Sequence, residues 1–260
     1  KAVFLTLLPK RIMKKKLFFP LFFVVLMLVA WTRFNTPTTH QFSEDTSKDK
    51  LLMELIAYFM QRGHFDPKDI SNDFSEDLYE TFLEMLDGQK RYFLKKDIAQ
   101  FDRYKYALDD EFRALQTNFF DLVYARYLER RNETKSFYLE ILEKPFDFSK
   151  KEEVNVDYEN QQHPGTLRQK TEKWRKQLKL STLNILHNKL EEEEKLAAKD
   201  ESYVPKTFEV LEEEARGITR ENMENYFSLM EDVREEDWFG SYLNAFVTQF
   251  DPHSVYFAPV

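Results

Sequence analysis

The chain has 260 residues, a net charge of -8 at pH 7, 16% aromatic residues and only five glycines. This profile favours long helices with aromatic packing over a turn-rich β fold. The negative balance argues against a nucleic-acid-binding surface, because such a surface needs a basic face. The absence of cysteine excludes disulfides, thiolate metal sites and a cysteine for lipid attachment.

A basic and then apolar pattern marks the first part of the chain. Met13 is followed by three lysines and an apolar run over 17–31, which is the form of a secretory signal. We therefore expect residues 1–34 to hold upstream residues and a signal peptide that starts at Met13, followed by a linker over 35–49. The apolar run is shorter than the ~20 residues that span a bilayer, so cleavage and export are favoured. An uncleaved membrane anchor stays open as the alternative.

Hydrophobic periodicity predicts helices over most of the remaining chain. The first begins at Ser47 and ends at Gly63, and the second begins at a Ser75 cap and ends at a left-handed Gly88. The buried face of the second helix is expected to comprise Leu78, Phe82, Met85 and Leu86. A short helix is expected near 96–101.

The longest periodic segment covers 109–131. We expect it to continue, with a bend, until Pro145 stops it. Residues 146–165 are irregular, with a weak strand signal at 154–156. Further helices are predicted over 166–180, 183–199, 208–215, 220–231 and 235–250. The expected fold class is mostly α, an irregular multi-helix domain with a long central helix, preceded by the signal segment; a hinge at 145–165 is an alternative to one contiguous domain.

Residues 251–254 include an aspartate, a histidine and a serine, the residue types of a hydrolytic triad. A triad requires these side chains to converge in hydrogen-bond order, usually from separate segments. Neighbouring residues in an extended or turn conformation point in different directions. We therefore predict a turn that begins at Asp251 before the rigid Pro252, with His253 and Ser254 bonded to local backbone groups. No catalytic residue is assigned in this sequence.

No metal or cofactor site is predicted. The other histidines lack the spacing of metal ligands; they are His40, His64, His163 and His187. The glutamate run 191–194 is interpreted as a solvated helix face, because it lacks the loop geometry of a calcium site. The few glycines leave no phosphate-binding loop. Trp174 and the aromatic residues of 109–142 are interpreted as packing residues rather than a recognition surface.

The last stretch of the chain resembles a known family. Residues 251–259 are similar to the Asp-Pro-His-Ser/Thr-x-Tyr-Leu/Phe-x-Pro stretch that precedes the PDZ domain in the carboxyl-terminal processing, or tail-specific, peptidases. The matching positions are Asp251, Pro252, His253, Ser254, Tyr256 and Pro259. Residues 82–87, 92–101 and 142–148 look like the helical N-terminal region of the same family and follow in the same order.

The resemblance implies that residues 50–250 form the helical N-terminal domain of an exported, periplasmic protease, and that residues 251–260 lead into a PDZ domain outside this sequence. In the family, the PDZ domain reads an apolar C terminus and a Ser-Lys dyad cuts. A desolvated lysine can lie neutral near pH 7 and take the serine proton. Both dyad residues follow the PDZ domain, so only the full-length parent is expected to be an enzyme.

The partners that the resemblance implies are protein substrates, the protein's own PDZ and protease domains and, in some members, an adaptor lipoprotein. Two other interpretations stay open. One is a free-standing periplasmic helical adaptor or binding module that holds partners with its aromatic face. The other is a structural protein anchored in the inner membrane. We expect Val255, Tyr256 and Phe257 to be exposed, because the sequence after them offers nothing for them to pack on.

Overall fold

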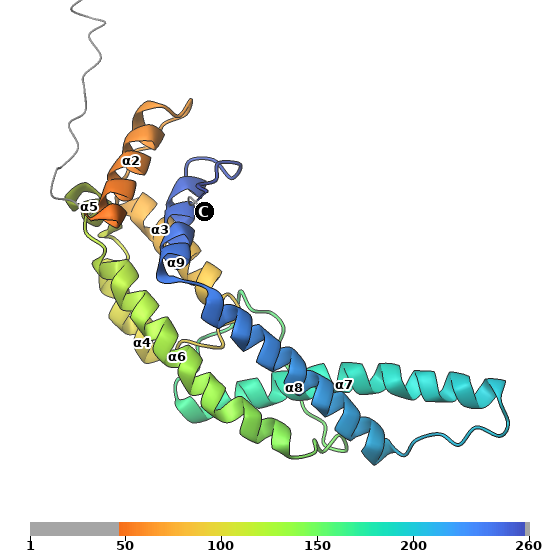
Figure 1. The fold of residues 1–260 in the computed structure, drawn as a ribbon. Coiled ribbons are helices and arrows are strands. Elements are labelled where there is room, and N and C mark those ends of the chain that lie inside the picture. Colours follow the sequence, from red (N-terminus) through yellow and green to blue (C-terminus); the bar gives the residue numbers. More distant parts are fainter. Residues whose placement is uncertain (1–46, 258–260) are drawn as a thin grey trace, which may run out of the picture. The chain divides into compact units, whose positions relative to one another are not determined.

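A computed structural model describes residues 47–257, and every regular element in this range is helical (Figure 1). The helices are α2 (Lys48–Arg62), α3 (Asn72–Asp87), α4 (Lys95–Phe101), the 3-10 helix η1 (Asp102–Tyr104), α5 (Leu108–Ala114), α6 (Asn118–Glu143), α7 (Leu167–Lys199), α8 (Phe208–Asp232) and α9 (Glu235–Thr248). The mostly α fold class is therefore confirmed, whereas the strand signal at 154–156 is wrong. The expected signal segment 1–34 and most of the linker 35–49 lie outside the described residues.

Side-chain caps determine where three of the helices begin. Ser71 caps α3, Thr166 caps α7 and Thr207 caps α8, each accepting a hydrogen bond from the backbone N–H three residues later at 3.2–3.5 Å. The predicted cap at Ser75 is wrong, because α3 begins one turn earlier. Ser75 lies inside the helix, and its hydroxyl donates to the Asp109 carboxylate at 2.8 Å.

The end of α3 differs from expectation at two residues. Gly88 has φ -54°, so the predicted left-handed cap is wrong. A glycine fits there for lack of space, since a Cβ would lie 2.9 Å from the Glu84 carbonyl oxygen. Met85, predicted to be buried, is 48% exposed and lines a pocket beside Asp87. The other three residues of the predicted face are buried, as expected.

The long helix predicted before Pro145 is divided at Leu115, which has φ 52° in the left-handed region. This conformation costs a non-glycine residue about 1–2 kcal/mol, and it separates α5 from α6. The continuation as far as Glu143 is confirmed. The longest described helix is instead α7, with 33 residues, which joins two segments that were predicted separately. The helix α8 joins two others because Gly217 continues it without a break.

α6 packs against two groups of helices, one near its start and one near its end (Figure 1). Near its start, the ring of Phe120 lies 5.0 Å from that of Phe239 on α9. Near its end, Tyr138 stacks on Phe227 of α8 at 4.9 Å. The helices α2, α3, α5 and α9 contact one another around the first end, and α7 packs along α8 at the second.

The centre of the first group is an aromatic core. Tyr242 and Phe246 of α9 are fully buried. The ring of Phe246 stacks on Phe112 at 4.1 Å, and Tyr242 lies edge-on to Phe82 at 4.9 Å.

Trp174, on α7, is 1% exposed, so its interpretation as a packing residue is confirmed. Among the residues that the structure describes, no helix combines the length and apolarity needed to cross a membrane.

Candidate functional site: the Asp251 turn and the buried polar centres

The segment after α9 forms a turn around Asp251. The Asp251 carboxylate accepts the backbone N–H of His253 at 3.1 Å and the hydroxyl of Ser254 at 3.2 Å. Its pKa is lowered, chiefly by the hydrogen bond from the His253 N–H. A triad serine must donate to an imidazole, whereas Ser254 donates to the carboxylate. The arrangement is that of an aspartate-initiated turn; Pro259 of the motif lies outside the described residues.

Asn244 of α9 binds the backbone of Tyr256 with both ends of its amide. The Tyr256 N–H donates to Asn244 Oδ1 at 2.7 Å, and Asn244 Nδ2 donates to the Tyr256 carbonyl at 3.0 Å. The tyrosine ring lies close to Gly240, where a Cβ would be 3.8 Å from Cε1. Burial, and secondarily the charge of Asp49, raise the pKa of Tyr256. The segment 251–257 is therefore folded back onto α9.

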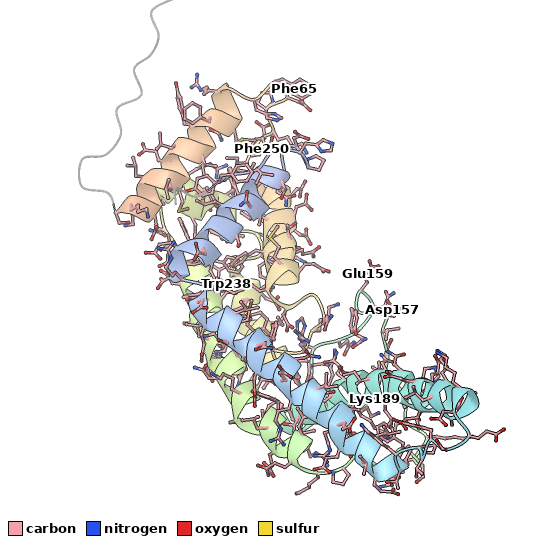
Figure 2. All side chains as sticks on the ribbon, turned by 45° about the vertical axis from the view of Figure 1, so that its right-hand side comes forward. Phe65, Asp157, Glu159, Lys189, Trp238 and Phe250 are labelled. Atoms are coloured by element: carbon pink, nitrogen blue, oxygen red, sulfur yellow. The ribbon has the colours of Figure 1, made fainter. Side chains whose placement is uncertain are left out.

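Apolar side chains remain exposed at this end of the molecule. Val255 is 53% exposed, Phe257 84% and Phe65 93%. Figure 2 shows Phe65, in the loop after α2, at the same end as Phe250. The exposure expected for Val255 and Phe257 is present, and these side chains offer contact surface to a further element. The exposure expected for Tyr256 is wrong, because its ring is half-buried and packs against the hydrophobic core.

A buried carboxylate organises the loop after α3. Asp87 is 4% exposed and accepts the backbone N–H groups of Arg91, Tyr92 and Phe93 at 2.7–3.1 Å. Burial raises the pKa of Asp87 to about 6, although these three hydrogen bonds oppose the shift. His163 Nε2 lies 3.7 Å from Asp87 Oδ2. Burial, together with two nearby lysines, lowers the pKa of His163 to about 4, so near pH 7 the histidine is neutral and the aspartate ionised.

The Arg91 side chain lies among three aromatic rings. Its guanidinium carbon is 4.7 Å from the ring centroid of Trp174, 5.3 Å from that of Tyr92 and 5.5 Å from that of Tyr226. The hydroxyls of Tyr92 and Tyr226 are 2.8 Å apart. Trp174 Nε1 donates to the Arg91 carbonyl at 2.9 Å. These contacts fix the α3–α4 loop against α7 and α8.

A second buried carboxylate joins α4 to α6. Asp97 accepts the Leu94 N–H at 2.8 Å, Arg130 Nε at 2.7 Å and a hydrogen bond from Arg126. Burial alone would raise the pKa of Asp97, but the bonds from Arg130, Leu94 and Arg126 outweigh it and lower the pKa. The buried ammonium of Lys170 donates to the Arg130 carbonyl at 2.7 Å. A carboxylate held ionised by two guanidiniums serves as a structural tie between helices.

Within residues 47–257, no group of three or more metal-ligating side chains has the geometry to hold a metal ion. His187 Nε2 lies 3.3 Å from Glu191 of the glutamate run. Glu193 is an exception to the predicted solvated face. It is 9% exposed and accepts the Tyr203 hydroxyl at 2.8 Å and the Lys206 N–H at 2.9 Å, which ties the α7–α8 loop to α7.

Sequence reasoning did not identify Asn244, Asp87 or Asp97 as organising residues. Asn244 interrupts the apolar stripe of α9, which is a signal that a polar partner is needed. Asp87 and Asp97 stand at a helix end and in a first helical turn, where carboxylates commonly remain in solvent. Their burial becomes evident only in the fold, where three backbone N–H groups of the following loop surround Asp87 and two arginines of α6 meet Asp97.

The fold and these centres define a helical domain with an aromatic core, structural polar centres and a last helix that leads into an extended segment. Residues 56–260 match the family described as the tail specific protease N-terminal domain, and the chain belongs to that family. The tail-specific protease of Haemophilus influenzae is 23% identical over 201 residues, which are 77% of this chain and 26% of that protein. The chain thus spans about a quarter of this relative's length, and the resemblance stated from the sequence is confirmed.

Proposed function

We propose that this chain is the helical, non-catalytic scaffold part of an exported tail-specific protease. The protease would degrade or process proteins after recognising an apolar C terminus. Membership of the N-terminal domain family over residues 56–260 supports this role. The relative's name, tail-specific protease, supports the activity assigned to the parent protein.

The catalytic Ser-Lys dyad and the PDZ domain would lie outside these residues. Ser254 is a poor nucleophile in its present setting, because its hydroxyl donates to the Asp251 carboxylate rather than to a general base. Buried Lys170 cannot act as the dyad lysine here, because its ammonium is committed to the Arg130 carbonyl and Glu133. In this proposal the part described positions other domains, and residues outside it cut the substrate.

The observation that carries the proposal is the two-ended hydrogen bond between Asn244 and Tyr256. It sets the direction in which the backbone leaves α9, so the segment 251–257 would orient whatever follows. The exposed Val255 and Phe257 would pack on that following part. The proposed partners are the PDZ and protease domains of the same parent protein, protein substrates and an adaptor lipoprotein. The proposed location is the periplasm.

The proposal is tested on the protein encoded by the complete reading frame that contains these residues. We expect this frame to encode a PDZ domain followed by a serine and a downstream lysine, and the purified product to cleave a reporter with an apolar tail but spare one with a charged tail. In that protein, Asn244→Ala should lower kcat/KM, whereas Ser241→Ala, one turn earlier on α9, should not. An immediate stop codon would favour the free-standing adaptor instead.

A further inference from the structure

Residues 150–162, which we call the strap, connect the α6 end of the chain to α7 without forming a helix or strand. None of their side chains is buried, and Val156 is 63% exposed. Figure 2 marks the outer part of the strap at Asp157 and Glu159. Burial of apolar surface therefore contributes little to holding the strap in place.

Cations hold the strap instead. Lys90 Nζ donates to the Glu159 carbonyl at 2.7 Å and Lys95 Nζ to the Gln162 side chain, and the other cations belong to α7. We call these α7 cations the cationic face; they are Lys173, Arg175, Lys176 and Lys179. Lys176 Nζ donates to the Glu153 carbonyl at 3.2 Å, and Lys173 Nζ donates to the Gln161 side-chain oxygen at 2.6 Å. These bonds reach strap positions that are well separated along the chain, so one helix face follows an extended segment.

Glu152 is the ionic centre of this contact. Its carboxylate accepts Lys179 Nζ at 2.5 Å and also pairs with Arg175. These two cations lower the pKa of Glu152 to about 2. Lys179 Nζ additionally donates to the Asp147 carbonyl at 2.6 Å, just before the strap.

The acceptors describe the kind of ligand that fits the cationic face. Most of them are main-chain carbonyls or a side-chain amide, and one is a carboxylate. A helix or a paired strand would already use its carbonyls internally, so a ligand with free carbonyls must be an extended polypeptide. The carboxylate contact with two cations adds a preference for acidic sequence.

Open space lies on both sides of the strap. A pocket of about 630 Å³ separates residues 156–159 from the end of α3, and another of about 460 Å³ lies beside residues 161–166. The strap is thus attached at a few polar points and not packed along its length. Polar contacts of this kind exchange with water and with competing ligands at modest cost.

We propose that the cationic face of α7 is a docking surface for an extended acidic polypeptide, and that the strap is a built-in competitor for that surface. A partner binds the face by displacing the strap. Its apparent dissociation constant is then the intrinsic value divided by the fraction of molecules in which the strap is open.

A polypeptide fits this surface better than a nucleic acid. Trp174, the aromatic residue that lies between these cations in the sequence, is 1% exposed and offers no platform for base stacking. The net charge of the chain is -8, which repels a polyanion beyond the local contact. A short acidic peptide carries fewer negative charges than a polyanion, so this wider repulsion opposes its binding less.

The test measures binding of two labelled peptides to the full chain by fluorescence anisotropy at low ionic strength. One has the sequence of residues 149–162, and the other has its acidic residues replaced by the corresponding amides. We expect saturable binding of the acidic peptide and binding at least about 5-fold weaker for the neutral one. Hydrogen exchange in residues 150–162 of the protein should rise when the acidic peptide binds, because the strap leaves the face.

Three variants separate the face from the strap. Glu152→Gln weakens the strap and should tighten peptide binding by about 3-fold or more. The double variant Arg175→Gln, Lys176→Gln removes half of the face and should weaken binding by about 10-fold. Lys195→Gln changes an exposed cation further along α7 that pairs with Glu191, and it should leave binding unchanged. Circular dichroism establishes that each variant is folded.

Several results would overturn the proposal. They are failure of the acidic peptide to bind even to the Glu152→Gln variant, undiminished binding to the folded double variant, and unchanged exchange of residues 150–162 upon binding. Equal binding of a single-stranded DNA oligonucleotide of matched charge would show that the surface selects polyanions rather than polypeptides, and would also overturn it.

Discussion

Asp87 and His163 lie 3.7 Å apart, with pKa values displaced in opposite directions by the same burial. The carboxyl pKa rises to about 6 and the imidazole pKa falls to about 4. Between these values the folded protein keeps a proton on Asp87 that the unfolded chain releases, and lacks a proton on His163 that the unfolded chain binds. The two contributions to the pH dependence of stability therefore nearly cancel.

Single substitutions should separate the two contributions. With Asp87 intact, its raised pKa makes stability fall as the pH rises from about 4 to about 6, by about 1.4 kcal/mol per pH unit. His163 acts in the opposite sense, since its lowered pKa makes stability rise between about pH 4 and 6.5. Relative to the unsubstituted protein, Asp87→Asn should therefore gain stability as the pH rises through this range, and His163→Gln should lose it.

Urea unfolding at several pH values from 4 to 7 measures these slopes. His187→Gln is the matched control, because His187 is an exposed histidine of α7. Parallel curves for the Asp87 and His163 variants would mean that neither group titrates abnormally in the folded state.

Removal of the Asp97 carboxylate should be among the costliest single changes. Asp97→Ala removes the fully buried charge partner of Arg130, whose guanidinium is 3% exposed, and leaves it paired with the more exposed Glu133 and Glu129. Breaking one side of a buried pair costs about 3–5 kcal/mol. The control is Asp110→Asn, whose carboxylate is 78% exposed and whose loss should have little effect. A small change in the urea midpoint for Asp97→Ala would argue against a structural tie between α4 and α6.

The aromatic core predicts a similar contrast between two phenylalanines. Phe246 is fully buried and stacks on Phe112 at 4.1 Å, so Phe246→Ala should destabilise the fold by about 3–5 kcal/mol. Phe65 is 93% exposed, and Phe65→Ala should change stability by less than about 0.5 kcal/mol. Thermal unfolding followed by circular dichroism compares the two, and equal shifts in Tm would contradict the core described above.

The contact between Asn244 and Tyr256 should control local order without controlling the fold. Asn244→Ala removes both hydrogen bonds to the Tyr256 backbone, and hydrogen exchange of residues 251–257 should then become faster. Global stability should fall by only about 1–2 kcal/mol. Ser241→Ala is the control, since its hydroxyl donates to the Asp237 carbonyl within α9 and not to the segment 251–257. Unchanged exchange at Tyr256 would mean that other contacts hold the segment.

Features with a local cause could be predicted from the sequence. Gly63 follows α2 and Pro145 follows α6, as expected from their backbone preferences. The short helix near 96–101 is present as α4. The family resemblance of residues 251–259 rests on the residues themselves and needs no fold to be seen.

Features with a distant cause could not be predicted. Leu115 adopts a left-handed conformation although leucine gives no sequence signal for it. Its side chain packs against the hydrophobic core, which offsets the local cost. Ser75 resembles a helix cap until Asp109, 34 residues later, takes its hydroxyl. The burial of Asp87 and its closeness to His163 likewise depend on a loop that has no periodic pattern.

The most direct measurement is the peptidase activity of the purified 260-residue chain on a protein substrate with an apolar C-terminal tail, together with labelling by a serine-reactive probe. We predict no cleavage and no labelled serine, because in the proposal the helical part positions the other domains and does not contain the Ser-Lys dyad. Cleavage that a serine reagent or the Ser254→Ala substitution abolishes would contradict this directly.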